Sequence, residues 1–396
     1  MPTIVLDFEI SRLPHQLTGL DRYHSALCLF RHNRRPVARA QLPIYKGRLM
    51  GRDLRECLLA QFGPDLVQAW LEDVLGPELK PADSTKSLRA TIAICTRDRP
   101  EDLRNCLSSL RRLPDDGQEV LVVDNASKAD ATEKAVRDYP PARYVREDRP
   151  GLDCARNRAL LASRGDIVAF IDDDATADPV WLRALVSGFE DPLVMAVGGL
   201  TMPSELETEA QELFEKIGGF SRGFRRRRYS LESHTPESGG AAGSGVNMAF
   251  RRDVIEKVGL FDEALDAGTV TLSGGDTEMF ARILAGGYDI IYEPAALNWH
   301  RHRRTYAELK HTVFGYGVGL YAAWTRNLFI GKHWTVLPAV YRWIRNVQIP
   351  RIRDGVFGRP GAWPMDLTFA ELRGTFLGPW AYWRARRRLR AMARGA

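Results

Sequence analysis

The sequence predicts an α/β fold in which a mostly parallel sheet is flanked by helices. Between residues 88 and 303, short apolar runs alternate with segments of helical spacing, as is typical of parallel strands joined by helices. The clearest strand is Ile167–Ile171, because all five residues are apolar and most are β-branched. Such a composition is typical of a strand that is buried on both faces.

Within residues 88–303 the order of elements can be predicted directly. Strands are expected at Ala90–Cys95, Glu119–Val123, Ala142–Arg146, Asp166–Ile171, Leu193–Gly198, Val246–Phe250 and Tyr288–Tyr292. Helices are expected at Pro100–Arg112, Lys128–Asp138, Asp153–Ser163, Pro179–Glu190, Arg252–Val258 and Asp276–Ala285. The helix after Ile171 has a good N-cap in Asp178 and a proline at its expected first position.

Residues 1–85 predict a separate small α+β unit without any cluster of chemically active residues. A polar turn between two apolar runs predicts a hairpin, and helical spacing with a polar linker follows. The hairpin strands are Ser25–Phe30 and Pro36–Leu42, and Thr3–Ile10 alternates weakly before them. Gly51–Phe62 and Asp65–Leu75 have the helical spacing, and Lys80–Ser87 is the linker.

Residues 304–396 predict a helical extension that is rich in tryptophan and arginine, with a strongly cationic tail at Arg384–Arg394. Two interpretations stay open. The extension either rests on an anionic membrane surface, where each Lys or Arg adds about 1 kcal/mol, or packs its tryptophans on the preceding domain. The glycine-rich stretch 200–245, which contains Arg225–Arg228, is either an acceptor-binding loop for an anionic group or a solvated basic loop.

The overall composition is that of ordinary globular material with a modest basic excess. The 396 residues are 44% hydrophobic and carry 56 Lys and Arg against 50 Asp and Glu, enough for two or three domains. Five cysteines without CxxC spacing argue against a disulfide framework or a zinc site and favour a reducing compartment. We see no signal peptide and no apolar run of the ~20 residues that a membrane span needs. A cytoplasmic location is therefore expected.

Three consecutive carboxylates, Asp172, Asp173 and Asp174, follow the strand Ile167–Ile171 in an expected strand-to-helix loop. Ligands of open α/β sheets bind in loops at the carboxyl ends of strands. Adjacent carboxylates repel one another, and a divalent cation relieves that repulsion. Because one helix does not need three capping residues, the cluster indicates a metal or nucleotide site.

Other polar residues follow predicted strands or precede predicted helices. Thr96, Asp98 and Asp124 end the first two strands, where they either line a ligand crevice or cap the next helix. Arg156 lies in the first turn of a helix opened by Gly151, a position suited to phosphate. Further along, the candidates are Gly245 and Asn247 around a turn, Asp276 and Glu278 at a helix start, and His300 after the last strand.

Taken together, these stretches resemble the family 2 glycosyltransferases, inverting enzymes of the Rossmann-like GT-A fold. The matching pieces occur in the family's order within about residues 90–300: TRDRPEDL, VVDNAS, GLDCARNRAL, IVAFIDDDATADPVWL, GSGVNMAFRR and GGDTEMFARIL. The resemblance implies a nucleoside-diphosphate-sugar donor, a glycan or lipid-linked acceptor, and Mg²⁺ or Mn²⁺ as cofactor. It does not imply binding of nucleic acid.

The resemblance also implies roles for individual residues. Asp276 matches the catalytic base. Asp174 and His300 would hold the metal ion. Gly245, Asn247 and Glu278 would lie on the acceptor side. Nucleotide-sugar binding would fall to Thr96, Asp98, Asp124, Arg156, Asp172 and Asp173.

Two departures from the family pattern stand out. The usual Glu-Asp pair before the last helix is Gly275-Asp276 here, so one carboxylate is missing. The QxxRW element and membrane spans of processive synthases are not found, which favours transfer of a single sugar.

Alternative functions stay open. A sugar-nucleotide pyrophosphorylase would share the acidic site but needs a glycine-rich phosphate loop after the first strand, where TRDRP has none. A non-catalytic sugar-nucleotide-binding or membrane-surface protein is compatible with the missing carboxylate. A dinucleotide-dependent dehydrogenase is disfavoured, because no G-x-G-x-x-G follows an early strand.

Overall fold

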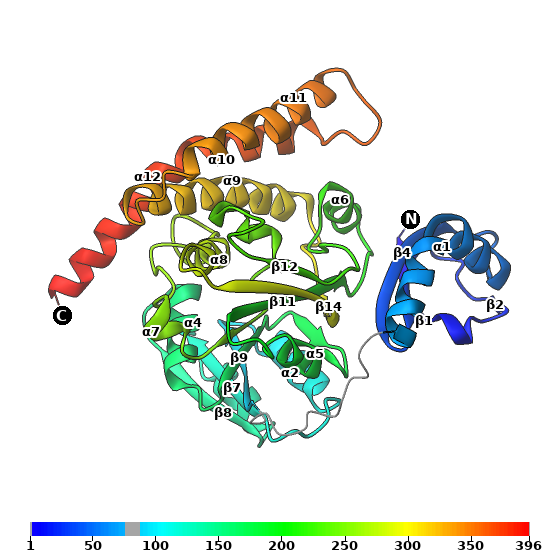
Figure 1. Ribbon diagram of the computed structural model, residues 1–396, viewed down its shortest axis with the longest axis horizontal. Coiled ribbons are helices and arrows are strands. Elements are labelled where there is room, and N and C mark those ends of the chain that lie inside the picture. The colour runs from blue at the N-terminus through cyan, green and yellow to red at the C-terminus, as the bar shows by residue number, and fades with distance from the viewer. Residues whose placement is uncertain (1, 76–87, 396) are drawn as a thin grey trace.

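The computed structural model describes residues 2–75 and 88–395 and has a nine-stranded sheet at its centre (Figure 1). The strand order is β10-β14-β11-β13-β9-β6-β7-β8, with β12 paired to β14. Six strands run in one direction, whereas β10, β12 and β13 run against them. The strands are β6 Ala90–Thr96, β7 Glu119–Asn125, β8 Ala142–Glu147, β9 Ile167–Ile171, β10 Ala175–Ala177, β11 Val194–Pro203, β12 Arg227–Tyr229, β13 Asn247–Arg251 and β14 Asp289–His300.

Helices cover both faces of this sheet, which confirms the expected α/β class with a mostly parallel sheet. Side chains alternate along each strand, so Ile92 and Ile94 of β6 join one apolar layer and Ala93 joins the other. The helices of this part are α2 Pro100–Leu110, α3 Ala131–Arg137, α4 Leu152–Ala162, α5 Trp181–Ser187, α6 Glu209–Ile217, α7 Val254–Lys257 and α8 Gly275–Ala285.

The segment after β9 differs from the prediction. The acidic residues lead into the short strand β10, and the helix begins only at Trp181 and ends at Ser187. The cause lies in β14, which continues to His300 rather than ending at Tyr292 and pairs antiparallel with β10. The acidic cluster therefore sits in a strand-to-strand turn.

The N-terminal part contains the predicted hairpin, formed by β3 Ser25–His32 and β4 Arg35–Pro43, with β1 Thr3–Glu9 alongside. The short strands β2 Gln16–Leu17 and β5 Leu49–Met50 form a second pair. Two separate helices were expected here, but α1 is one helix, Gly51–Leu75, that continues through Pro64. A proline removes one backbone hydrogen bond, and the rest of the helix can bridge that loss. The expected linker Lys80–Ser87 lies outside the described residues.

The N-terminal part packs against the central sheet domain beside β14 (Figure 1). The Thr3 amide donates to the carbonyl of Leu206 at 2.9 Å. Arg31 joins the two parts through an ion pair of 2.7 Å with Asp178, and both side chains are buried. Removing one partner of such a buried pair leaves the other charge uncompensated. The ion pair therefore favours one position of the N-terminal part relative to the sheet.

In the C-terminal part, residues 304–395, the helices are α9 Tyr306–Phe329, α10 Val336–Trp343, α11 Ile349–Val356 and α12 Met365–Gly395. Helix α9 lies against α8, and α12 packs on α9 (Figure 1). A π-helical segment, Ile344–Gln348, joins α10 to α11. Helices α9 and α12 approach closely at Gly317, where an added Cβ would lie 2.2 Å from the carbonyl oxygen of Glu371. Among the described residues, no helix has the length and hydropathy of a membrane span.

The arginine run in the stretch 200–245 does not reach the acidic cluster. Strand β12 pairs with the first half of β14, with Arg227 opposite Tyr292, eight residues before His300. Arg228 forms ion pairs with Asp191 and Asp289. β12 thus holds the run toward the opposite end of β14, and its expected role, either binding an anionic acceptor or forming a solvated basic loop, stays a prediction.

Candidate active site

The ends of β9 and β14 bring three potential metal ligands together. One ligand atom each from Asp172, Asp174 and His300 lies within 4.8 Å of the other two, and His300 Nε2 is 3.1 Å from Asp174 Oδ1. The pairing of Ala175 with His300 sets this distance. Two carboxylates and an imidazole form a donor set that suits Mn²⁺, and the carboxylates alone suit Mg²⁺. The residues present thus fit a divalent cation.

The charges of this cluster shift the pKa values of its carboxyl groups in opposite directions. Burial, followed by the charge of Asp174, raises the pKa of Asp172 to about 7. Burial acts in the same sense on Asp174, but the neighbouring His300 and Arg303 outweigh it and lower its pKa. Full ionisation of both carboxyl groups is therefore unfavourable until a cation joins them.

The middle carboxylate, Asp173, does not belong to this ligand set. It accepts a hydrogen bond of 2.7 Å from the hydroxyl of Thr96 and one of 3.2 Å from Arg99. Arg99 also contacts Asp174 at 3.2 Å. Thr96 and Asp173 therefore lie beside the cluster as a mutual pair, and Arg99, a residue without an assigned role in the sequence analysis, adds a cation at its edge.

Asp98 and Asp124 both hold the loop that follows β7. Asp98 accepts from the Lys128 amide at 2.8 Å. Asp124 is buried and accepts from the Tyr144 hydroxyl at 2.8 Å and from the Ser127 amide at 3.1 Å. The structure thus brings both residues to the expected edge of the sheet, with their oxygens engaged by the protein's own groups.

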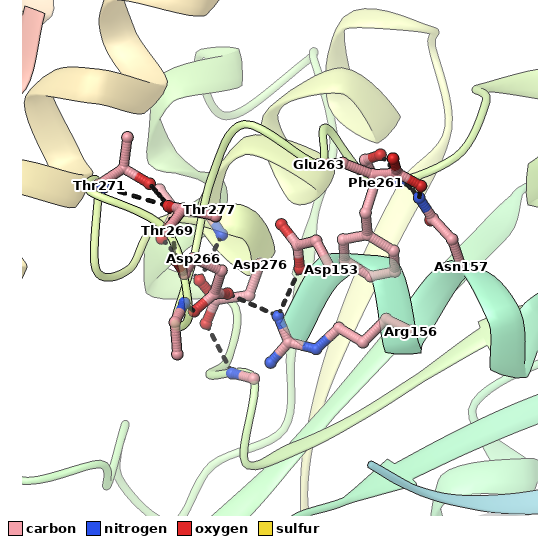
Figure 2. A network of polar contacts seen from close by, with 12 residues as sticks. Asp153, Arg156, Asn157, Phe261, Glu263, Asp266, Thr269, Thr271, Asp276 and Thr277 are labelled. Atoms are coloured by element: carbon pink, nitrogen blue, oxygen red, sulfur yellow. Dashed lines mark hydrogen bonds and ion pairs between the residues drawn. The ribbon is translucent and has the colours of Figure 1, made fainter. Parts of the chain in front are cut away.

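Arg156 lies at the centre of a buried group of carboxylates (Figure 2). Its guanidinium donates to Asp153 at 2.9 Å and to Asp266 at 2.6 Å. Its own burial acts to lower its pKa, but Asp266, Asp153 and the more distant carboxylates outweigh this and raise it. Arg156 is therefore a fixed positive charge between carboxylates, and it is engaged from two sides.

Asp276 lies in the first turn of α8, next to this group (Figure 2). Its Oδ2 accepts a hydrogen bond of 2.6 Å from the Gly245 amide, and its Oδ1 accepts one of 2.7 Å from the Thr277 amide. Two amides thus fix the carboxylate, and an α-helix N-terminus favours negative charge.

Asn247 and Glu278 do not line the site, contrary to expectation. Both are fully buried. Asn247 accepts from Trp181 Nε1 at 2.8 Å and donates to two backbone carbonyls of the sheet. Glu278 pairs with Arg282 at 2.7 Å and Arg326 at 2.9 Å. The family resemblance implied an acceptor role for both, but burial and internal pairing make them structural residues.

The comparison with protein families agrees with this geometry. Residues 91–259 match the model of the family described as glycosyl transferase family 2. This region is a family 2 glycosyltransferase domain. It includes the acidic cluster, Arg156 and Gly245, whereas Asp276 and His300 follow it in the chain.

Several curated relatives of this glycosyltransferase domain are themselves named glycosyltransferases. The glycosyltransferase AglE of Haloferax volcanii is 27% identical over 59% of this chain and 73% of its own length. A glucosyl-dolichyl phosphate glucuronosyltransferase of the same organism is 30% identical over 44% and 56%, respectively. The pre-mycofactocin glycosyltransferase of Mycobacterium tuberculosis is 29% identical over 68% and 52%. The chain thus corresponds to about half the length of the last two.

Among solved structures, similarity is found to the mannosyltransferase PcManGT of Pyrobaculum calidifontis in complex with GDP-Man and Mn²⁺. That match has a TM-score of 0.48 and 22% identity, and covers 86% of each chain. The glucosyl-3-phosphoglycerate synthase of Mycobacterium tuberculosis matches with a TM-score of 0.42 and 21% identity, over 60% of this chain and 78% of its own.

The structure explains why this chain has glycine rather than a carboxylate before Asp276. A Cβ at Gly275 would lie 2.0 Å from Oδ2 of Asp153, so Asp153 fills the space that a side chain there would need. Asp153 is completely buried, and its Oδ2 has no hydrogen-bond partner. A carboxylate from α4 therefore stands beside the backbone of residue 275.

Two residues near the site of the glycosyltransferase were missed by sequence reasoning. Desolvation and then the charge of Asp276 raise the pKa of the Tyr316 phenol on α9, and Asp172 acts on it in the same sense. His302 is buried next to His300, and burial lowers its pKa, which keeps the ring neutral. In the sequence, Tyr316 and His302 stand out only by their spacing from glycines and from His300. Such spacing does not distinguish a residue of the active site from a residue of the core.

Proposed function

We propose that this chain is a metal-dependent, inverting glycosyltransferase that moves one sugar from a nucleoside-diphosphate sugar to an acceptor hydroxyl. The observation that carries this proposal is that one charged region contains both a candidate metal site and a fixed carboxylate. The ligand set Asp172, Asp174 and His300 suits a cation, and the carboxylate of Asp276 is held by two amides nearby. Tyr316 interacts electrostatically with both groups.

A divalent cation held by Asp172, Asp174 and His300 would neutralise charge on the diphosphate as that group leaves. Around it, the chain itself supplies two exposed arginines, Arg99 and Arg303, which now contact Asp174 at 3.2 and 3.4 Å. Both can turn toward phosphate oxygens, for which guanidinium is well suited.

Asp276 would act as the general base. Its carboxylate takes the proton of the acceptor hydroxyl, while the hydroxyl oxygen forms a bond to the anomeric carbon. The bond from that carbon to the diphosphate breaks on the opposite face, so the configuration inverts. The amides of Gly245 and Thr277 hold the carboxylate in place, and a positioned base typically contributes ~10²–10⁴-fold to the rate.

Donor binding tests this function directly. Thermal unfolding would be measured with a panel of nucleoside diphosphates, with and without Mn²⁺, on the wild type and on Asp174→Ala. A ligand at about one hundred times its Kd adds ~2.7 kcal/mol to stability. We expect one diphosphate to stabilise the wild type in the presence of Mn²⁺ and to leave Asp174→Ala unchanged. The exposed Asp138→Ala serves as the control. If no diphosphate stabilises the wild type, the proposal is wrong and the acidic cluster is not a donor site.

We further propose that the acceptor is lipid-linked and is reached at an anionic membrane surface. The name of the glucosyl-dolichyl phosphate relative supports a lipid-linked acceptor. The C-terminal part supports a location at a membrane surface, because large apolar side chains in its helices and connections, such as Trp334, Phe357 and Phe376, are 71%, 72% and 81% exposed. Arginines lie among them, and together these features are typical of interfacial helices. All five cysteines are free, which supports the reducing, cytoplasmic face.

A further inference from the structure

A chain of hydrogen bonds connects the candidate metal ligand His300 to the N-terminal part of the protein. His300 Nδ1 lies 3.1 Å from His302 Nδ1, and His302 Nε2 lies 2.8 Å from Glu215 Oε1. The second oxygen of Glu215 accepts from Arg39 at 2.6 Å. Glu215 is on α6 and Arg39 on β4, so three distant segments meet behind the candidate metal site.

The members of this chain are held rigidly. His300, His302 and the side chain of Glu215 are all less than 10% exposed. Aromatic rings pack on the two imidazoles: Phe214 lies 4.7 Å from the ring centre of His302, and Phe220 lies 5.1 Å from that of His300. Packing of this kind fixes the plane of each imidazole, and the hydrogen bonds then decide where its proton sits.

Which atom donates in each of these hydrogen bonds follows from the groups that can carry a proton. An ionised carboxylate only accepts, so His302 must donate to Glu215 from Nε2. A neutral imidazole has a single N–H, which leaves Nδ1 of His302 as an acceptor. His300 must then donate from its own Nδ1, and its Nε2 keeps a free lone pair. That Nε2 is the atom 3.1 Å from Asp174 Oδ1.

An imidazole lone pair and a carboxylate oxygen at this distance repel each other unless a proton or a metal ion lies between them. Because Nδ1 already donates to His302, Nε2 is the ring nitrogen that a metal ion can take in place of a proton. Metal-bound histidines commonly donate their other ring N–H to a partner in the protein, and loss of such partners typically costs about 10–100-fold in metal affinity.

We propose that Arg39, Glu215 and His302 are positioning residues that fix the Nδ1–H tautomer of His300 for a divalent cation. The N-terminal part then completes the support of the metal site, a task that no other feature of residues 1–85 suggested. This inference rests on the proposed function, because it takes the cation at Asp172, Asp174 and His300 as given.

Mn²⁺ affinity of the full chain, measured by electron paramagnetic resonance of free Mn²⁺, tests the proposal without reference to activity. Glu215→Gln places an amide donor or a weaker acceptor beside His302, and we expect about 10–100-fold weaker binding. Arg39→Gln should weaken binding in the same direction but less. The matched control is Glu207→Gln, because the Glu207 carboxylate also joins the N-terminal part, through Arg22 and Tyr23 rather than through the imidazole of His302.

Unchanged affinity in Glu215→Gln, with Mn²⁺ binding by the wild type intact, overturns the inference and leaves the proposed function standing. A wild type that binds no Mn²⁺ contradicts the metal-dependent function itself, and with it this inference. Equal losses in Glu215→Gln and Glu207→Gln also overturn it, because they indicate general loosening of the docked part.

A second measurement uses the wild type alone, so it does not depend on whether a variant folds. Nitrogen-15 spectra of histidine-labelled, Mg²⁺-loaded wild type report the tautomer of each imidazole. We expect Nε2–H for His302 and Nδ1–H for His300. The opposite tautomer at His302 overturns the inference whatever the affinities show.

Discussion

The amide of Gly245 donates a hydrogen bond of 2.6 Å to Oδ2 of Asp276. This bond ties the turn before β13 to the first turn of α8, 31 residues apart in sequence. The contact is close because residue 245 has no side chain: a Cβ there would lie 2.5 Å from a guanidinium nitrogen of Arg156 and 3.3 Å from Asp276 Oδ2. Gly245 thus sets the position of the proposed base.

Gly245→Ala is therefore expected to lower turnover more than stability. The added methyl group must push Arg156 or Asp276 aside, and a displacement near 1 Å in a catalytic group can cost about 10²-fold. Turnover and Tm would be measured together. Gly63→Ala is the control, because a Cβ at that position meets nothing within 4 Å. Normal turnover in Gly245→Ala would show that the position of Asp276 does not limit the reaction.

Asp276→Asn tests the base itself. The amide side chain has the same shape and can still accept from Gly245, but it cannot take a proton from the acceptor. We expect turnover to fall by ~10²–10⁴-fold, with donor binding by calorimetry unchanged. Near-normal turnover would mean that another group is the base. Loss of donor binding would mean that Asp276 holds the donor instead.

The two outer carboxylates of the acidic cluster should differ from the middle one. Asp172 and Asp174 contribute to the ligand set, whereas Asp173 is engaged by Thr96. Asp172→Asn and Asp174→Asn are expected to reduce Mn²⁺ affinity by at least about tenfold, the lower end for changes around a metal site. Asp173→Asn should change it far less. Equal losses in all three variants would contradict the division of roles.

Asp172 gives the metal-free protein a defined pH dependence. Its pKa is raised from 3.8 to about 7 in the folded state, so ionisation of Asp172 disfavours folding. The stability that the protonated form supplies is fully present below about pH 4 and is lost as the pH rises through about 7. Denaturant unfolding in a chelator should therefore show wild-type stability falling relative to Asp172→Asn over this interval. Parallel curves for the two proteins would rule out the shift.

Much of the fold was predictable because its signals are local. The apolar run Ile167–Ile171 and the three carboxylates after it lie within eight residues, and the structure puts the strand where the pattern indicates, although a strand rather than a helix follows the carboxylates. Strand β10 was missed because three residues, Ala175–Ala177, carry no periodicity. It exists because β14 extends to meet it.

The supporting residues could not be predicted, because their partners are far away in sequence. Arg39 is 176 residues from Glu215, and Glu215 is 87 residues from His302. Asn247 shows the reverse error. The family resemblance implied a place on the acceptor side, but the Asn247 side chain donates to two buried backbone carbonyls of the sheet.

The exposed aromatic residues of α12 should anchor the protein to anionic lipid. Phe376 and Trp380 are 81% and 56% exposed, and Arg384 lies 4.9 Å from the ring centre of Trp380. Apolar burial and arginine attraction, about 1 kcal/mol per basic residue near the surface, act together there. Trp380→Glu is expected to reduce co-flotation with anionic vesicles several-fold, the size expected from losing one large apolar contact.

The matched control is Trp70→Glu, an exposed tryptophan of α1 at 54%, which should float like the wild type. Neutral vesicles should bind the wild type more weakly than anionic ones, since they offer only the apolar component. Equal flotation of Trp380→Glu and wild type would exclude α12 as the anchor. Equal binding to both vesicle types would exclude the arginines, and an acceptor held at an anionic surface would then need another contact with the protein.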